Sequence, residues 1–211
     1  MKNTLEISSL VKKYGKKTAL DKVSYVFGNG IYGILGPNGA GKSTLMNIIT
    51  TGIIADEGNV IYNGKDIKGN NEYKKIIGYV PQQQRMYEEF TGKQYLGYFA
   101  ALKGVKGKEV KKRIDDVLRM VNLYDVANVK IKAYSGGMKQ RILIAQAFMA
   151  DFEILILDEP TVGLDPEERE RFKTMLKDLS KDKIIILATH IVSDLDDIAD
   201  YIIHMKNGKI V

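Results

Sequence analysis

The sequence predicts an α/β fold in which a mostly parallel sheet is flanked by helices. In the C-terminal half, strand-sized apolar runs at residues 154–157 and 184–188 alternate with helical segments, as in sheets built with crossover helices. Residues 4–35 instead carry strand patterns separated by turn glycines, and residues 85–134 carry helical periodicity. We therefore expect one domain over residues 1–211, with an N-terminal antiparallel β subdomain and a small helical subdomain at about residues 85–134.

The N-terminal part reads as short strands around one glycine-rich loop. Leu5, Ile7 and Val11 mark a first strand, and the turn signal Asn63-Gly64 closes a later one. The segment after the loop places its apolar residues on one face of a helix. The other elements expected here are strands at Val23–Phe27, Ile31–Leu35, Asn59–Asn63 and Ile76–Val80 and a helix at Ser43–Thr51.

The rest of the chain alternates between helices and strands. In the helical subdomain, apolar spacing of three or four residues indicates two helical faces, made of Tyr95, Phe99 and Leu102 and of Val110, Ile114, Val117 and Leu118. Further on, we expect helices at Gly136–Ala150, Pro166–Leu179 and Ser193–Ala199 and strands at Ile154–Leu157, Ile184–Ala188 and Tyr201–Met205.

Composition points to a protein of the cell interior. A chain of 211 residues, 45% hydrophobic, can bury a sizeable core, and it has no cysteine for disulfides. No window approaches the roughly 18–20 uninterrupted apolar residues of a membrane-spanning helix, and the first residues lack the apolar core of a secretory signal. We expect a cytoplasmic location. The net charge of +6 comes from scattered lysines and by itself indicates no partner.

The loop between the third strand and the following helix matches a phosphate-binding pattern. The pattern G-x-x-x-x-G-K-[ST] is fulfilled by Gly36, Pro37, Asn38, Gly39, Ala40, Gly41, Lys42 and Ser43. Glycines let the backbone wrap closely around phosphates, and a helix N-terminus adds partial positive charge. We expect Lys42 to neutralise the β and γ phosphates, Ser43 to bind Mg²⁺ and Thr44 to act as a supporting donor. The loop therefore predicts a nucleoside triphosphate site in a P-loop NTPase core.

Two adjacent carboxylates follow the apolar strand at residues 154–157. Open α/β sheets place their ligands at this end of the strands, so Asp158 and Glu159 suit catalysis. We expect Asp158 to reach the metal or its second coordination sphere. Glu159 is expected to polarise a water molecule for attack on the γ-phosphate. Two solvated acids capping a loop are the alternative, which the neighbouring phosphate loop disfavours.

A second glycine-rich segment opens the helix before that strand. Its core, Ser135-Gly136-Gly137, resembles the LSGGQ signature of the ABC superfamily, with Tyr134 in place of Leu and Met138 in place of Gln. A serine at a helix N-terminus followed by two glycines is an anion-binding feature in its own right. The resemblance implies that each ATP lies between the phosphate loop of one domain and, in trans, the signature of a second domain, in a homodimer or a heterodimer.

The resemblance to ABC transporter ATP-binding proteins extends to four further positions in the expected order. Gln82, which directly follows Pro81, resembles the glutamine that reaches Mg²⁺ and the attacking water and links the site to the membrane partner. Asp165 ends a segment that resembles the D-loop at the dimer interface, and in trans it would face the partner's ATP. His190 resembles the switch histidine that contacts the γ-phosphate. Tyr14 resembles the aromatic residue that stacks on adenine.

This resemblance implies an ATP-hydrolysing subunit that dimerises around Mg-ATP and drives transport through separate transmembrane permease subunits. The phrase from Asp158 to Pro166, DEPTVGLDP, looks most like bacterial exporters, so we favour export over import. Such a chain is peripheral at the inner face of the cell membrane, and we expect no nucleic acid partner.

Two other functions compete with transport. A soluble ABC-type ATPase of DNA repair resembles this chain less, because repair members insert a long coiled coil and residues 76–134 hold only a short helical segment. Translation-type members generally carry two cassettes, and this chain carries one. A regulatory nucleotide-binding module without hydrolysis is disfavoured by the presence of both Glu159 and His190.

Overall fold

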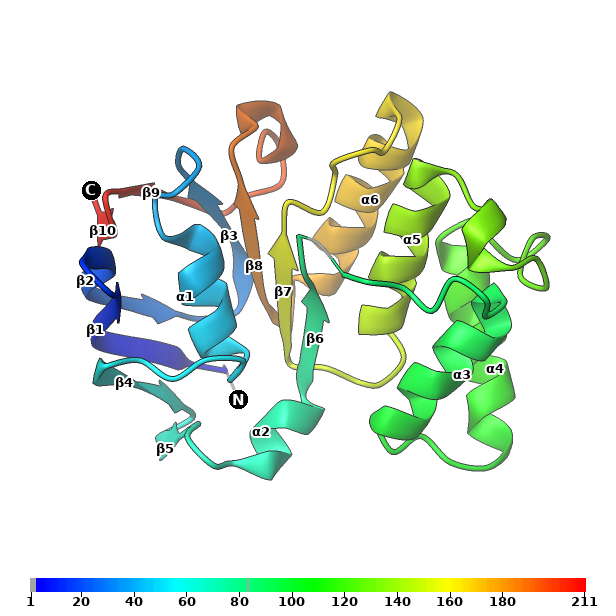
Figure 1. Cartoon of the computed structure of the whole chain (residues 1–211), viewed down its shortest axis with the longest axis horizontal. Helices are drawn as coiled ribbons and strands as arrows, with labels where there is room; N and C mark the ends of the chain where they lie inside the picture. Colours follow the sequence, from blue (N-terminus) through cyan, green and yellow to red (C-terminus); the bar gives the residue numbers. More distant parts are fainter. Residues whose placement is uncertain (1–2, 83) are drawn as a thin grey trace.

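The computed structural model describes residues 3–82 and 84–211, and in them two sheets face each other across a helix (Figure 1). The larger sheet has six strands in the order β10-β9-β3-β8-β7-β6, all neighbours being parallel except the β9–β10 pair. Its strands β7 and β8 are buried along their whole length, which confirms the reading of their apolar runs. The bounds are β3 Gly30–Leu35, β6 Ile77–Val80, β7 Ile154–Asp158, β8 Ile184–Thr189, β9 Tyr201–Lys206 and β10 Lys209–Ile210.

The smaller sheet is antiparallel, with the order β2-β1-β4-β5. Helix α1 (Lys42–Ile49) lies between it and the larger sheet, so that its apolar side chains share one core with both (Figure 1). This arrangement brings the β1–β2 hairpin next to the start of α1, where the phosphate loop lies. The strands are β1 Leu5–Tyr14, β2 Lys17–Phe27, β4 Glu57–Tyr62 and β5 Lys65–Asp66.

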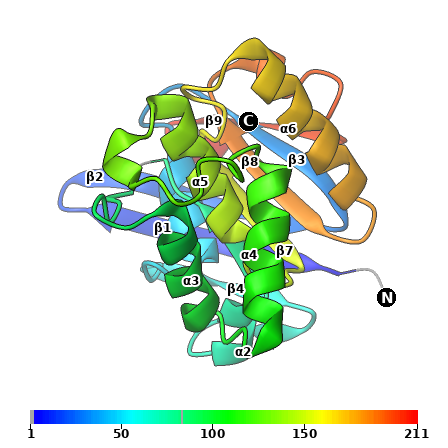
Figure 2. The same ribbon diagram turned by 90° about the vertical axis from the view of Figure 1, so that its right-hand side faces the viewer.

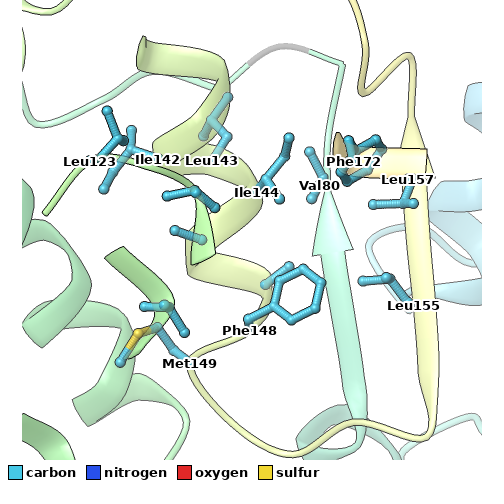
Figure 3. Packing of buried hydrophobic residues seen from close by; sticks show 14 of the residues in the cluster. Val80, Leu123, Ile142, Leu143, Ile144, Phe148, Met149, Leu155, Leu157 and Phe172 are labelled. Carbon is cyan, nitrogen blue, oxygen red and sulfur yellow. The ribbon is translucent and has the colours of Figure 1, made fainter. Parts of the chain in front are cut away.

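A group of helices packs on the other side of the large sheet and forms a second core (Figure 2). In Figure 3, Ile144 of α5 and Phe148, which follows the last residue of that helix, lie toward Val80 of β6. Helix α5 thus joins the helical part to the sheet. The helices of this group are α3 Gly92–Leu102, α4 Lys108–Met120, α5 Gly136–Ala147 and α6 Pro166–Leu179, with short 3₁₀ turns η1 Ile131–Ala133 and η2 Val192–Asp194. The short helix α2 Asn71–Lys75 instead packs its Tyr73 into the core shared with the smaller sheet.

Three side chains from separate elements form a closed ring of hydrogen bonds in this helical part. The Gln84 amide donates to the Tyr95 hydroxyl over 3.2 Å, Tyr95 donates to Gln146 over 2.6 Å, and Gln146 donates back to Gln84 over 2.8 Å. Each group both donates and accepts, so the ring is satisfied although Tyr95 and Gln146 are buried. The segment that follows β6 is thereby fixed to α3 and to α5.

The predicted helix at Ser193–Ala199 is wrong. Only the single 3₁₀ turn η2 forms there, followed by turns through Ile198, and Asp197 has a positive φ of 64°. The Asp194 carboxylate is turned inward and bonded to Thr161 and Thr189, which holds the backbone in a turn. The prediction rested on apolar spacing at Leu195 and Ile198, whose side chains are buried without a regular helix.

Truncation of a central core residue measures how much the sheet depends on its apolar packing. Ile186 of β8 is fully buried, whereas Ile202 of β9 is 47% exposed. We expect Ile186→Ala to lower the free energy of unfolding by about 2–5 kcal/mol, because it removes buried methyl groups and leaves a cavity. Ile202→Ala should lose less than about 1 kcal/mol. Urea denaturation of both variants checks this, and equal losses would contradict the assigned core.

Candidate functional site

One hollow of about 280 Å³ opens at the carboxyl end of the parallel strands, beside the start of α1. It brings together residues that lie far apart in the sequence and come from the β1–β2 hairpin, the phosphate loop, the end of β6 and the end of β7. Its lining residues are Tyr14, Lys17, Ala19, Asn38, Gly39, Ala40, Gly41, Lys42, Ser43, Thr44, Gln82 and Glu159. Tyr14 is 51% exposed at the rim, as a side chain that stacks on a bound base must be.

At Gly41 the phosphate loop, Gly36–Ser43, passes too close to β2 for a side chain. Gly41 has a φ of 107°, and a Cβ atom there would stand 2.5 Å from the carbonyl oxygen of Ala19. The α1 helix that follows has no side-chain cap and no acidic residue in its first turn. Its first backbone N–H groups therefore lack helical partners and face no competing carboxylate of that turn. The loop and helix start form a cradle suited to an anion.

Lys42 is buried to 95% of its surface yet keeps its ammonium in the hollow. Its Nζ donates to the Gly36 carbonyl over 2.6 Å and to the Pro37 carbonyl over 3.4 Å. The same Nζ lies 3.8 Å from Oε1 of Glu159. A buried ammonium needs such partners, and phosphate oxygens of a nucleotide would offer stronger, charge-assisted ones.

Glu159 is held in an unusual conformation one residue beyond β7. Its φ is 51°, a left-handed conformation that carries strain for a residue other than glycine. Its backbone N–H donates to the Ala188 carbonyl over 2.8 Å, which keeps the residue against β8. Its Oε1 lies 2.8 Å from Nδ1 of His190, and its Oε2 accepts a 3.1 Å hydrogen bond from Thr189. The carboxylate is thus placed by backbone and side chain together.

Asp158 is the last residue of β7 and is buried, and its Oδ1 has no hydrogen-bond partner. Burial raises the pKa of Asp158 above its usual value; the Ser43 hydroxyl offsets part of this, the Glu159 carboxylate adds to it, and the Lys42 ammonium lowers it. A buried, unpartnered carboxylate oxygen beside a serine hydroxyl is the arrangement that a hard cation such as Mg²⁺ would satisfy. Across residues 3–82 and 84–211, no cluster of three or more His, Cys, Asp or Glu side chains offers a full protein cage for a metal.

The signature residues lie outside this hollow. Ser135 caps α5 by accepting a 3.2 Å hydrogen bond from the Met138 backbone, and Gly136 follows it on the exposed surface. A Cβ atom on Gly137 would stand 3.0 Å from the Gly163 carbonyl, so the signature packs on the segment that ends at Asp165. Asp165 in turn caps α6. The structure does not bring the signature and the phosphate loop of one chain together.

Lys17 lines the hollow although the sequence analysis did not name it. Its Nζ lies 3.9 Å from where a Cβ atom of Gly39 would be, above the phosphate loop. The available signal was the pair Lys16-Lys17 in the turn after Tyr14, which places positive charge beside a predicted base-stacking residue. This pair does not stand out in the sequence, because lysines are spread along the whole chain. Its place over the phosphate loop follows only from the β1–β2 hairpin.

Comparison with known proteins agrees with this geometry. A family model described as "ABC transporter" matches residues 20–162. The chain is 37% identical over 210 residues to the linearmycin resistance ATP-binding protein LnrL of Bacillus subtilis, covering 98% of this chain and 68% of that protein. It is 32% identical over 211 residues to the Nod factor export ATP-binding protein I of Ralstonia nicotianae, covering 97% and 65% respectively.

Some relatives are much longer. The human ATP-binding cassette sub-family A member 10 is 34% identical over 217 residues, which are 99% of this chain and 14% of that protein. Among solved structures, the dimeric bacterial ABC transporter cassette MJ0796 superposes with a TM-score of 0.89 at 29% identity, covering 98% of this chain and 96% of that one. A post-hydrolysis dimer of the same cassette, bound to ADP and Pi, superposes equally well.

The family follows from two findings. The family model matches more than half of the chain, and relatives above 30% identity align with nearly all of it. The fold, with its antiparallel sheet, its mixed sheet and its flanking helices, is the one that the sequence predicted. The chain belongs to the ABC transporter family, as an ATP-binding cassette with the ATPase fold of that family.

Proposed function

We propose that this chain is the ATP-hydrolysing motor of an exporter and that Glu159 is its catalytic base. The observation that carries the proposal is the position of Glu159 in the hollow, between the Lys42 ammonium of the phosphate loop and Nδ1 of His190. A carboxylate there can accept a proton from a water molecule that attacks the γ-phosphate. A module that only binds nucleotide has no need of a strained, buried carboxylate at this point.

Several side chains of the site have a task in this mechanism. ATP would exchange the Lys42 bonds to Gly36 and Pro37 for bonds to its phosphates, and Tyr14 would stack on its base. Glu159 would then orient the water, and His190, whose Nδ1 lies 2.8 Å from Oε1 of Glu159, would contact the γ-phosphate. Developing charge on the phosphate oxygens is met by Lys42 and by the N-terminus of α1.

Mg²⁺ is the expected cofactor, and the residues fit it. Ser43 and Asp158 would hold the ion, since Asp158 has a buried oxygen without a partner. Gln82 at the rim of the same hollow is the third expected ligand. Bound Mg²⁺ would neutralise phosphate charge and fix the triphosphate. With so few protein ligands, the remaining coordination would come from phosphates and water.

A second cassette completes each site in this proposal. Ser135, Gly136 and the cap residue Asp165 are exposed, Gly137 is half-buried, and none of the four lines the chain's own hollow. They are therefore available to the nucleotide of a second copy or of a related subunit, in agreement with the dimeric state of MJ0796.

Coupling to transport would pass through membrane subunits on separate chains. Across the described residues, 3–82 and 84–211, no helix combines the length and the apolar character needed to span a membrane. The names of LnrL and the Nod factor export protein favour export, with this chain at the inner face of the cell membrane. A soluble cassette of DNA repair or translation remains the second candidate, and co-purification with a membrane protein distinguishes the two.

Glu159→Gln tests the catalytic base. The amide keeps the shape and a hydrogen bond to His190 but cannot take the proton, so kcat should fall by about 100-fold or more with ATP affinity within about threefold. A phosphate-release assay and nucleotide titration measure the two quantities. Glu57→Gln on the exposed edge of β4 is the control. Full activity of Glu159→Gln would show that another group is the base.

Asp158→Asn tests the metal ligand through stability as well as activity. Because the folded state raises the pKa of Asp158, its ionised form destabilises the fold at neutral pH. This loss is complete above the raised pKa and disappears as pH falls below it toward the ordinary aspartate value. The neutral variant should therefore have a higher Tm than the wild type at pH 7.5 in the absence of nucleotide, with a smaller gain at acid pH.

The same variant should lose the Mg²⁺ dependence of ATP binding. Asp178→Asn, on the exposed face of α6, controls for the removal of one charge. A lower Tm together with unchanged Mg²⁺ dependence would contradict the role of Asp158.

Mixing two inactive variants tests the shared site. Lys42→Ala disables the phosphate loop and Ser135→Arg blocks the signature, so each alone should be inactive. In mixed dimers one site combines an intact loop with an intact signature, and up to roughly a quarter of wild-type turnover should return. Phosphate release from the equimolar mixture is the measurement. If neither turnover nor ATP-dependent dimerisation appears, the two-chain site is wrong.

A further inference from the structure

A fully buried polar cluster lies directly behind Glu159, on the side away from the hollow. Its members are Thr161, Thr189 and Asp194, each exposed to 1% or less. They come from the loop after β7, the end of β8 and the turn η2. Burying a carboxylate and two hydroxyls is expensive unless every group is bonded, and the mechanism above uses none of them.

In this cluster the hydroxyl proton of Thr189 has two possible acceptors, the carboxylates of Glu159 and Asp194. The Thr161 hydroxyl donates to Oδ2 of Asp194. The Thr189 hydroxyl accepts from the Ile191 backbone and has acceptors at Oε2 of Glu159, 3.1 Å away, and Oδ2 of Asp194, 3.3 Å away. A hydroxyl has a single proton to donate. Since Thr161 already supplies Asp194, the nearer acceptor Glu159 takes the proton of Thr189.

We propose that Thr189 is a positioning residue for the catalytic base, and that Thr161 and Asp194 keep its hydroxyl directed at Glu159. The inference rests on the proposed role of Glu159. The hydrogen bond from Thr189 occupies Oε2, and this leaves Oε1, on the His190 side, to face the water. It also helps to hold Glu159 in its strained conformation with a φ of 51°.

Asp194 has a second partner that holds it in place. Nη1 of Arg169 on α6 lies 3.9 Å from Oδ1 of Asp194, and Nε of the same residue donates to the Leu164 carbonyl over 3.2 Å. The cluster is therefore braced by the segment at Gly163–Asp165, which we expect at the cassette interface. This brace explains how a buried carboxylate is tolerated here.

Removing the Thr161 hydroxyl should act on Glu159 through Thr189. Without the bond from Thr161, Oδ2 of Asp194 becomes the better acceptor, and the Thr189 proton turns away from Glu159. Thr161 and Thr189 should then act as one functional unit. If their hydroxyls are removed together, the fall in kcat should be smaller than the product of the two single falls, which is what two independent defects would give.

The experiment uses isosteric valine variants with serine as the matched control. Thr189→Val should lower kcat by roughly tenfold while KM for ATP stays within about twofold, because one hydrogen bond to a charged group is lost and the nucleotide cradle is untouched. Thr189→Ser, which keeps the hydroxyl, should restore kcat to within about twofold. Thr161→Val should show a smaller fall in kcat that Thr161→Ser rescues. The double valine variant should match Thr189→Val alone.

Any of the following results would contradict this inference. Wild-type kcat in Thr189→Val, no rescue by Thr189→Ser, or multiplied losses in the double variant would show that the cluster only supports the fold. If Thr189→Val does not fold, the Thr161→Val and Thr161→Ser pair decides, and an unchanged kcat in Thr161→Val refutes the inference. Glu159→Gln is measured in parallel: its full activity refutes the proposed base, whereas its inactivity beside an active Thr189→Val refutes only the positioning role.

Discussion

Two buried carboxylates at the carboxyl end of β7 face one buried ammonium, and the rest of the site is built around this charge balance. Asp158 and Glu159 are 2% and 3% exposed, and Lys42 is 5% exposed. Charges removed from water in this way are tolerated only with close partners. The strands place the carboxylates, and α1 brings the ammonium and the positive end of its dipole to the same point. A bound nucleotide would therefore change the partners of these charges, because its phosphate oxygens would offer Lys42 new acceptors.

Much of the fold follows from local sequence because it depends on local physical rules. The helix Pro166–Leu179 has the bounds that the sequence predicts, since an aspartate cap followed by proline fixes its start. Strands β7 and β8 are apolar on both faces, which in an α/β chain is typical of central strands of a parallel sheet. The short elements α2 and β5 escaped prediction because they are polar and brief. The local signals for α2 were its cap Asn70, an acidic residue in its first turn and two lysines in its last.

In the site, too, some residues can be predicted from local sequence and others cannot. The phosphate loop is one continuous stretch, so its position in the sequence is enough to place it. Lys17 enters the hollow only through the β1–β2 hairpin, and no local pattern reports that approach. Asp194 shows the same limit more sharply. Its inward hydrogen bonds with Thr161 and Thr189 both prevent the expected helix and create the cluster behind Glu159, and neither outcome follows from residue spacing.

The signature helix and the carboxylate loop of one chain are tied together. Gln140 of α5 donates to the Pro160 carbonyl over 2.8 Å, one residue beyond Glu159. Arg141 of the same helix bonds Glu168 of α6 over 3.2 Å. In the proposed dimer, the nucleotide of one cassette would contact the signature of the other, and the bond from Gln140 joins that signature helix to the loop that carries the other chain's own Glu159. We therefore expect the two sites of a pair to influence each other through hydrogen bonds within each chain.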